Sequence, residues 1–215
     1  AIRQARTQKL PGIIGVHFEG PYLNVARKGV HDPTKIRPFE EQAKALYGAT
    51  DLGCVVVTLA PELCSPGLIR ALTEAGVRVC AGHTAGSYED MQRALAEGLA
   101  GFTHLFNAMT PMQTRAPGVV GAALEDAQSW CGIIADGLHV KVAIAAKARG
   151  KMMLVSDAMP TVGSPEKTFV LAGDAIQVQN GVCVRADGTL AGSDMDMASA
   201  VRNAVHLLSQ PLEEA

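Results

Sequence analysis

Short apolar runs alternate along the chain with segments in which apolar residues recur every three or four positions. Runs rich in β-branched side chains are typical of buried strands, whereas three- and four-residue spacing is typical of helices. This alternation predicts parallel βα units. Strands are expected at residues 12–19, 54–59, 77–81, 101–105, 131–135 and 152–156, and helices at residues 40–47, 66–75, 88–97 and 140–149.

After Pro160 the pattern changes to an alternation of apolar and polar positions. The pairs Asn180-Gly181 and Asp187-Gly188 are turn signals within this stretch. Such pairs between alternating runs favour β-hairpins. We therefore expect a β-hairpin insertion here, followed by a last helix at about residues 197–209.

Polar residues distinguish two parallel architectures, an open doubly wound sheet and a closed (β/α)₈ barrel. A dinucleotide-binding sheet has a G-x-G-x-x-G turn after its first strand, and the segment GVHFEGPYLN lacks that spacing. A barrel places its active site at the C-terminal ends of its strands. The polar residues at or just beyond those ends are Glu19, His83, His104, Asp136, His139 and Asp157. We therefore predict an α/β fold of the (β/α)₈ TIM-barrel type, with residues 1–215 in one catalytic domain.

The expected core strands are too few for a closed barrel. About six are expected, whereas a barrel needs eight strands and typically about 250 residues. The chain also begins with Ala rather than Met and stops in the polar stretch QPLEEA. We therefore expect an incomplete barrel, a fragment with unpaired strand edges.

Composition argues against several classes of partner. The formal net charge is −2 and charges of both signs are mixed, so no basic stripe suits a nucleic-acid backbone. No apolar run approaches the roughly 20 residues of a membrane span, and the N-terminus lacks a hydrophobic signal region. We expect no membrane association and a cytoplasmic protein. The five cysteines contain no Cys-x-x-Cys pair, so neither a disulfide framework nor a thiolate zinc site is indicated.

Four of the six histidines stand beside glycine or at expected strand ends. One such histidine alone is more often structural than a ligand. Glu19, His83 and His104, however, end three different expected strands, and a barrel gathers strand ends around one axis. Two imidazoles and one carboxylate make a catalytic metal site with a coordination position left for water. Asp157 follows another apolar strand; a general base is favoured there over a further metal ligand or a structural cap.

Motifs in a fixed order link the chain to a known family. They are HFEGPYLN with KGVHDP, AGHTAGSY, THLFNAM, IIADGLHV, LVSDAM and GTLAGS. Together they resemble the N-acetylglucosamine-6-phosphate deacetylases, metal-dependent enzymes of the amidohydrolase superfamily, across essentially the whole chain.

The resemblance implies a role for each matching position. Glu19, His83 and His104 match the metal ligands, the metal being usually zinc or another divalent ion such as iron. Asp157 matches the catalytic acid/base, and His31 matches the catalytic residue that contacts the substrate acetamide. The implied substrate-binding residues are Val30, His31, Asn107, Ala108, Arg115, Asp136, His139, Leu190, Ala191 and Gly192. A homodimer is also implied, since the arginine matching Arg115 can reach the neighbouring subunit's site in this family.

The implied reaction is hydrolysis of the acetamide of N-acetylglucosamine 6-phosphate to glucosamine 6-phosphate and acetate, a step of amino-sugar catabolism. Two alternatives stay within enzymes: the galactosamine epimer as substrate, or another amidohydrolase acting on a cyclic amide. A third belongs to another class, a truncated, non-catalytic protein that binds a metal or a sugar phosphate. The sequence leaves open the C4 epimer, the identity of the metal and the presence of one ion or two.

Overall fold

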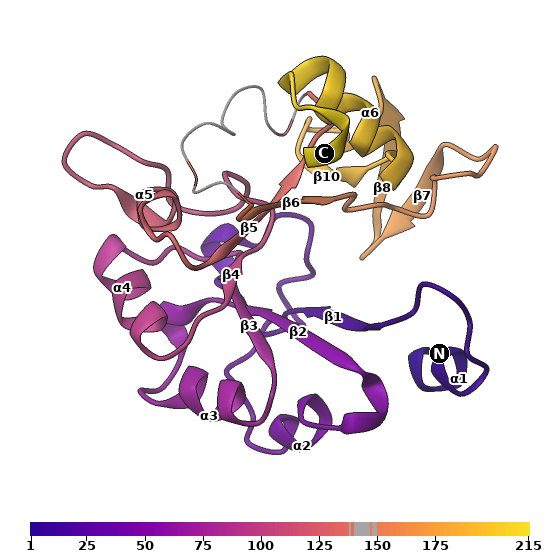
Figure 1. The fold of residues 1–215 in the computed structure, drawn as a ribbon. Helices are drawn as coiled ribbons and strands as arrows, with labels where there is room; N and C mark the ends of the chain where they lie inside the picture. The colour runs from indigo at the N-terminus through magenta and orange to yellow at the C-terminus, as the bar shows by residue number, and fades with distance from the viewer. Residues whose placement is uncertain (138, 140–146, 148–149) are drawn as a thin grey trace.

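The computed structural model describes residues 1–137, 139, 147 and 150–215, and two separate sheets organise them (Figure 1). The larger sheet is parallel and its strand order follows the sequence, β1-β2-β3-β4-β5-β6. Each strand pairs with the next one along the chain, so the sheet curls in one direction. Its strands are β1 Gly15–Glu19, β2 Cys54–Leu59, β3 Arg78–Ala81, β4 Gly101–Phe102, β5 Trp130–Ile134 and β6 Met152–Val155.

Helices cover the outer side of this curled sheet (Figure 1). They are α2 Ala43–Tyr47, α3 Leu68–Glu74, α4 Tyr88–Ala96 and α5 Gly118–Glu125. The main hydrophobic core lies between them and the sheet, and it includes Val57, Val79 and Leu72, all fully buried. Successive side chains of β1 point to opposite faces of the sheet, and Val16 and Phe18 point towards this core. The intervening residues of β1, His17 and Glu19, therefore face the inside of the curl.

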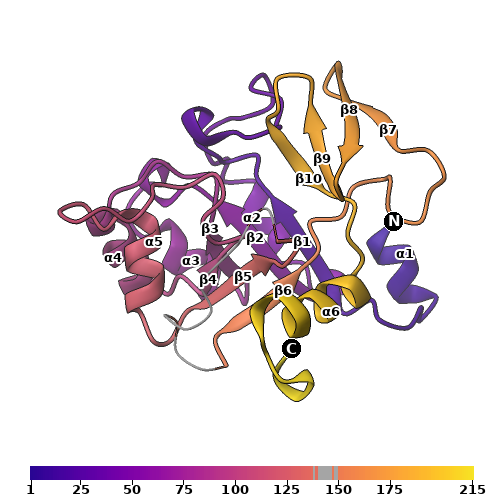
Figure 2. The same ribbon diagram turned by 90° about the horizontal axis from the view of Figure 1, so that it is seen from above.

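The second sheet is antiparallel and follows β6. Its strands are β7 Thr168–Leu171, β8 Asp174–Gln179, β9 Val182–Arg185 and β10 Leu190–Ser193, in the order β10-β9-β8-β7. Asn180 and Gly181 join β8 to β9 with positive φ at both positions, 52° and 85°, as a two-residue hairpin turn of type I′ requires. Ser193 N donates to Asp157 O at 2.9 Å, which ties β10 to the C-terminal end of β6. Figure 2 shows this sheet standing beside the strand ends.

The remaining elements are short or terminal. α1 Ile2–Thr7 precedes β1, and α6 Met197–Leu208 packs on β6 through a small core of Ile134, Met195 and Ala200. The described residues also form 3-10 turns: η1 Val25–Arg27, η2 Thr50–Leu52, η3 Pro61–Leu63 and η5 Leu212–Glu214.

The structure confirms an α/β fold with a curled parallel sheet, a hairpin-rich insertion and a closing helix. The expected strand 101–105 is shorter than predicted, because the chain turns away after Phe102 and His104 takes a positive φ of 31°. The expected helix at 40–47 begins only at Ala43, and α1 was not predicted. The expected helix at 140–149 lies outside the described residues, apart from Lys147. Among the described helices, none is long and apolar enough to cross a membrane.

Candidate metal and catalytic site

A cavity of about 830 Å³ opens at the C-terminal ends of the parallel strands. The second sheet contributes Leu171 and Leu190 to its wall. Most of the residues singled out from the sequence line this one cavity: Glu19, Val30, His31, His83, His104, Asn107, Ala108, His139, Asp157, Leu190 and Gly192. The ends of five parallel strands, β1, β3, β4, β5 and β6, and the loops that follow them thus converge on one site, as expected for parallel βα units.

Three of these side chains depend on an uncommon backbone conformation. His83, His104 and Asp157 have φ values of 48°, 31° and 48°. The left-handed region costs a residue with a Cβ atom roughly 1–2 kcal/mol, and such strain is concentrated at functional sites. Each of the three residues comes just after a strand of the parallel sheet, so the turn bends the chain sharply and aims the side chain across the strand ends.

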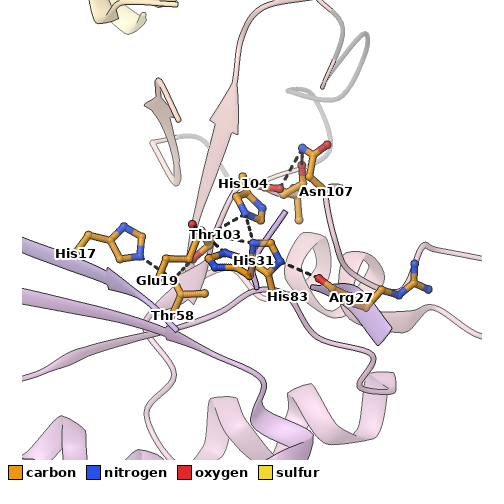
Figure 3. Close-up of polar contacts among 10 residues, drawn as sticks. His17, Glu19, Arg27, His31, Thr58, His83, Thr103, His104 and Asn107 are labelled. Carbon is orange, nitrogen blue, oxygen red and sulfur yellow. Dashed lines mark hydrogen bonds and ion pairs between the residues drawn. The ribbon is translucent and has the colours of Figure 1, made fainter. Parts of the chain in front are cut away.

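Glu19, His83 and His104 meet at a single point (Figure 3). Glu19 Oε1 lies 2.9 Å from His104 Nε2 and 3.3 Å from His83 Nε2. The two Nε2 atoms are 3.1 Å apart. His31 Nε2 lies 3.7 Å from the other oxygen, Glu19 Oε2. We call Glu19, His83 and His104 the trio. The side chains of its two histidines are more than nine-tenths buried.

The hydrogen bond behind His83 identifies its tautomer. Its Nδ1 lies 2.8 Å from the backbone carbonyl oxygen of Arg27, which can only accept a hydrogen bond. Nδ1 therefore carries a proton, so in the neutral form of the ring the lone pair lies on Nε2, which faces Glu19 and His104. A bonded carbonyl behind a histidine is the usual support of a metal-binding imidazole.

This trio fits a divalent metal ion. Within the described part of the chain, Glu19 Oε1 has no hydrogen-bond partner despite being buried, and neither has His104 Nδ1. A carboxylate oxygen and two imidazole nitrogens that converge within about 3.3 Å of one another form a donor set that a divalent cation can share in place of a proton. Glu19, His31 and His83 also form a group whose ligand atoms lie within 4.8 Å of one another. His31, expected to contact the acetamide, thus also lies beside the Glu19 carboxylate, as a metal-binding residue would.

Charges within the site shift its pKa values in opposite directions. Burial disfavours the charged form of Glu19, yet the neighbouring His104, His31 and His83 hold the pKa of its carboxyl far below the usual range. Burial likewise opposes charge on His104, but the adjacent carboxylate of Glu19 raises the pKa of that imidazole above 6.5. Burial, and secondarily the negative charge of Glu19, raises the pKa of Asp157.

His139 reaches the cavity from a rigid support. Its Nδ1 lies 2.6 Å from Asp136 Oδ2, and its backbone N–H donates to Asp136 Oδ1 at 2.8 Å. Both side chains are nearly fully buried. Asp136, expected to contact substrate, therefore lies behind His139 and fixes the orientation of its ring.

Two other expected substrate residues lie apart from the cavity. Arg115 occupies an exposed loop, and the cavity wall formed by the described residues does not include it. Ala191 is fully buried in the small core of the second sheet, between Leu190 and Gly192, which both line the cavity. Val30 lines the cavity and packs against this same core.

His17 lies close to the site but was not predicted from the sequence. Its Nε2 lies 2.7 Å from Thr58 Oγ1, which in turn lies 2.6 Å from Thr103 Oγ1. Burial lowers the pKa of His17 despite the nearby carboxylate of Glu19. Period-2 alternation along β1 was the available signal, since His17 stands two residues before Glu19 and on the same face.

Known proteins similar to this chain are deacetylases of amino-sugar phosphates, although no family profile matches it. The chain is 42% identical to the N-acetylgalactosamine-6-phosphate deacetylase of a Shewanella species over 100% of its own length and 56% of the relative. It is 35% identical to the N-acetylglucosamine-6-phosphate deacetylase of Haemophilus influenzae, over 94% of the chain and 55% of the relative.

Solved structures that resemble this chain are deacetylases of the same kind. The crystal structure of N-acetylglucosamine-6-phosphate deacetylase from Pasteurella multocida matches with a TM-score of 0.91 and 37% identity, over 99% of this chain and 57% of that one. A mutant of the enzyme from Mycobacterium smegmatis, in complex with N-acetyl-D-glucosamine-6-phosphate, matches with a TM-score of 0.85 and 33% identity, over 98% and 57%. The chain thus spans slightly more than half the length of these proteins, and by sequence and fold it is a homologue of the N-acetylglucosamine- and N-acetylgalactosamine-6-phosphate deacetylases.

Proposed function

We propose that this chain provides the catalytic centre of a metal-dependent deacetylase that hydrolyses the acetamide of an N-acetylhexosamine 6-phosphate. The observation that carries this proposal is the convergence of Glu19, His83 and His104 beside Asp157 in one cavity. The expected products are acetate and the free amino-sugar phosphate. Homologues named for this activity support the assignment.

Glu19, His83 and His104 would hold the divalent ion, for which zinc or iron is the natural choice with this donor set. When bound, the ion supplies Lewis-acid activation of water and of the amide carbonyl. Asp157 accepts the proton of the attacking water and then delivers it to the departing nitrogen. Its raised pKa suits a group that must hold a proton for part of the cycle.

The position of His31 suits two roles in this reaction. Donation of a hydrogen bond to the acetamide oxygen would stabilise the oxyanion. Its place 3.7 Å from Glu19 Oε2 also suits a further metal ligand. His31→Ala, which removes both the N–H donor and the ligand nitrogen, separates the two: a donor role leaves zinc stoichiometry and affinity unchanged while kcat falls, whereas a ligand role lowers zinc affinity.

The sugar phosphate would lie across the loops at the far side of the cavity. His139 and the backbone N–H of Ala108 offer donors to a phosphate or hydroxyl oxygen. Asn107 Nδ2 donates to the carbonyl oxygens of His104 and Leu105, so the side chain of Asn107 offers its Oδ1 as an acceptor to a sugar hydroxyl. All three residues line the cavity. Val30, Leu190 and Gly192 would contact the sugar from the opposite wall. The names of the homologues divide between the gluco and galacto epimers, so both are proposed substrates.

We infer that the curled sheet is part of a (β/α)₈ barrel and that residues 1–215 belong to one catalytic domain. Its six parallel strands run in sequence order with helices outside. The match to solved chains covers 57% of the Pasteurella structure, and two further strands would close such a sheet.

A homodimer would give Arg115 a partner, since its exposed loop lies off the cavity wall within the described residues. Mixing two inactive variants tests this idea. Subunits with Arg115→Ala and subunits with Asp157→Asn should regain activity on mixing, because a mixed dimer has one site with both groups intact. A strictly monomeric protein, or no recovery after subunit exchange, would contradict it.

The deciding experiment is acetate release from N-acetylglucosamine 6-phosphate and its galactosamine epimer, before and after chelation and zinc replacement. Release that requires both the metal and the phosphate supports the proposal, with unphosphorylated N-acetylglucosamine as the control substrate. A chain that binds zinc and sugar phosphate without any acetate release would instead be a non-catalytic binding protein.

A further inference from the structure

Glu62 lies behind the proposed metal ligands rather than among them. It belongs to η3, after β2, in a 160 Å³ crevice that it shares with Glu97. Its carboxylate accepts three hydrogen bonds from two other loops. Oε1 accepts from Asn24 Nδ2 at 3.0 Å and from the backbone N–H of Ala85 at 2.8 Å, and Oε2 accepts from Thr84 Oγ1 at 2.5 Å.

The first of these loops follows β3 and carries His83. Thr84 and Ala85 come directly after that histidine, whose φ of 48° is unfavourable for any residue with a side chain. Such a conformation persists only where its surroundings enforce it. Thr84 is fully buried, and its hydroxyl donates to Glu62 while it accepts from the backbone N–H of Gly86. Glu62 thus anchors the turn that bends His83 into the site.

The second loop follows β1 and supports His83 from behind. Asn24 N donates to His83 O at 2.8 Å, and Asn24 Oδ1 caps η1 by accepting from Ala26 N at 2.9 Å. η1 ends at Arg27, whose carbonyl oxygen accepts a hydrogen bond from Nδ1–H of His83 (Figure 3). Asn24 Nδ2 joins this loop to Glu62. One carboxylate therefore connects the residue after His83 with the turn that ends at the hydrogen-bond acceptor of its ring.

We propose that Glu62 is a positioning residue for the metal site: it holds His83 in the Nδ1-protonated form with Nε2 directed at Glu19 and His104. This inference rests on the metal site of the proposed function. Groups that orient a ligating histidine typically change metal affinity by 10- to 100-fold when they are removed. Glu62 does this through Asn24 and Thr84, without touching metal or substrate.

The test compares zinc affinity among four forms of the full chain, measured by competition with a chromogenic chelator. Glu62→Ala should raise the zinc dissociation constant by about 10- to 100-fold. Glu62→Gln should restore most of the affinity, because its amide oxygen can accept from Asn24 and Ala85 while its NH₂ donates to Thr84 Oγ1. Glu97→Ala is the matched control, since Glu97 lies in the same crevice and accepts from Gly67 N at 2.8 Å; its zinc affinity should equal that of wild type.

The ring of His83 provides a second readout that general loosening would not reproduce. In zinc-free protein, ¹⁵N NMR should report the Nδ1-protonated form for wild type and Glu62→Gln, and a mixture of tautomers for Glu62→Ala. A folded Glu62→Ala with wild-type zinc affinity and an unchanged ring overturns the inference.

Asn24→Ala decides the question if Glu62→Ala does not fold. It breaks the link to η1 and leaves Glu62 bonded to Thr84 and Ala85, so a smaller loss of zinc affinity is expected; an unchanged affinity overturns the inference. A wild-type chain that binds no zinc overturns the proposed metal site as well. Equal zinc binding by wild type and Glu62→Ala overturns the positioning role alone.

Discussion

Asp157 and Glu19 are two carboxyl groups in one cavity whose surroundings push their pKa values apart. Three histidines keep Glu19 ionised, whereas burial and the charge of Glu19 favour the protonated form of Asp157. When the pKa values of two neighbouring acidic groups are shifted in opposite directions, one group stays ionised while the other can hold a proton, so the two take different chemical roles. Glu19 is therefore suited to hold a cation permanently, and Asp157 is suited to exchange a proton.

Asp157→Asn should keep zinc and lose turnover. The amide cannot accept the proton of water, and removal of a general acid/base typically costs about 10²–10⁴ in kcat. Zinc content, measured by atomic absorption, should match wild type because Glu19, His83 and His104 are unchanged. Asp187→Asn, in an exposed hairpin turn, should change neither quantity. Wild-type kcat in Asp157→Asn would remove this residue from the base role.

Zinc affinity should rise with pH because of His104. In the metal-free protein its pKa lies above 6.5, so protonated His104 adds stability that is complete below pH 6.5 and is lost as pH rises through the raised pKa. A metal ligand must be deprotonated, so zinc must displace this proton. Titration calorimetry in buffers of different ionisation enthalpy should show more protons released per zinc near pH 6 than near pH 9. Equal release at both values would contradict the raised pKa.

At the scale of elements, apolar runs predicted most strands and the Asn180-Gly181 pair predicted the β8–β9 hairpin, because burial and turn chemistry act locally. The early end of β4 could not be predicted. It depends on positive φ at His104, Phe106 and Ala108, none of which is glycine. The convergence of Glu19, His83 and His104 was predictable from their places at strand ends. The tautomer of His83 was not, since it depends on a carbonyl more than fifty positions away.

Lys147 caps the C-terminal end of α5 by donating hydrogen bonds to its carbonyl groups. Its ammonium group is buried and donates to the carbonyl oxygens of Ala123 and Asp126 and to Ser129 Oγ at 3.1 Å. Helix ends leave carbonyl groups without partners, and a cation there is favourable. Lys147→Met should lower the free energy of unfolding by about 1–3 kcal/mol, the cost of stranding buried acceptors, as measured by urea denaturation.

Lys9→Met is the control for this change. Lys9 is exposed, so its replacement should alter the free energy of unfolding by no more than about 0.5 kcal/mol. Equal stabilities for the two variants would show that the buried ammonium group contributes nothing to the end of α5.

At the scale of the whole molecule, the order of the strands in the parallel sheet brings the site residues together. Among the described strands, β1 pairs only with β2 and β6 only with β5, so the curl has two free edges. The proposed ligands come from the ends of β1, β3 and β4, whereas Asp157 follows β6. Binding of an ion to the folded state alone should therefore stabilise the fold, by about 2.7 kcal/mol when free zinc is 100 times its dissociation constant.

Chemical denaturation with and without a chelator measures this stabilisation. The increase should disappear in His83→Ala, which removes one of the ligands, and persist in Asp157→Asn, which removes none. A zinc-induced increase of the same size in His83→Ala would mean that the ion binds elsewhere.

The ligands lie far apart in the sequence, and this gives a bound ion the character of a reversible cross-link. It closes a loop from Glu19 to His104, so it can be held only after β1 to β4 have paired. Asp157, the proposed proton-transfer group, lies beyond that loop and follows β6. Metal content therefore reports only whether β1 to β4 have assembled. A molecule misfolded around β5 and β6 would bind a full complement of metal and have no activity. Specific activity per bound ion, rather than metal content, is the quantity that reports whether the whole chain has folded.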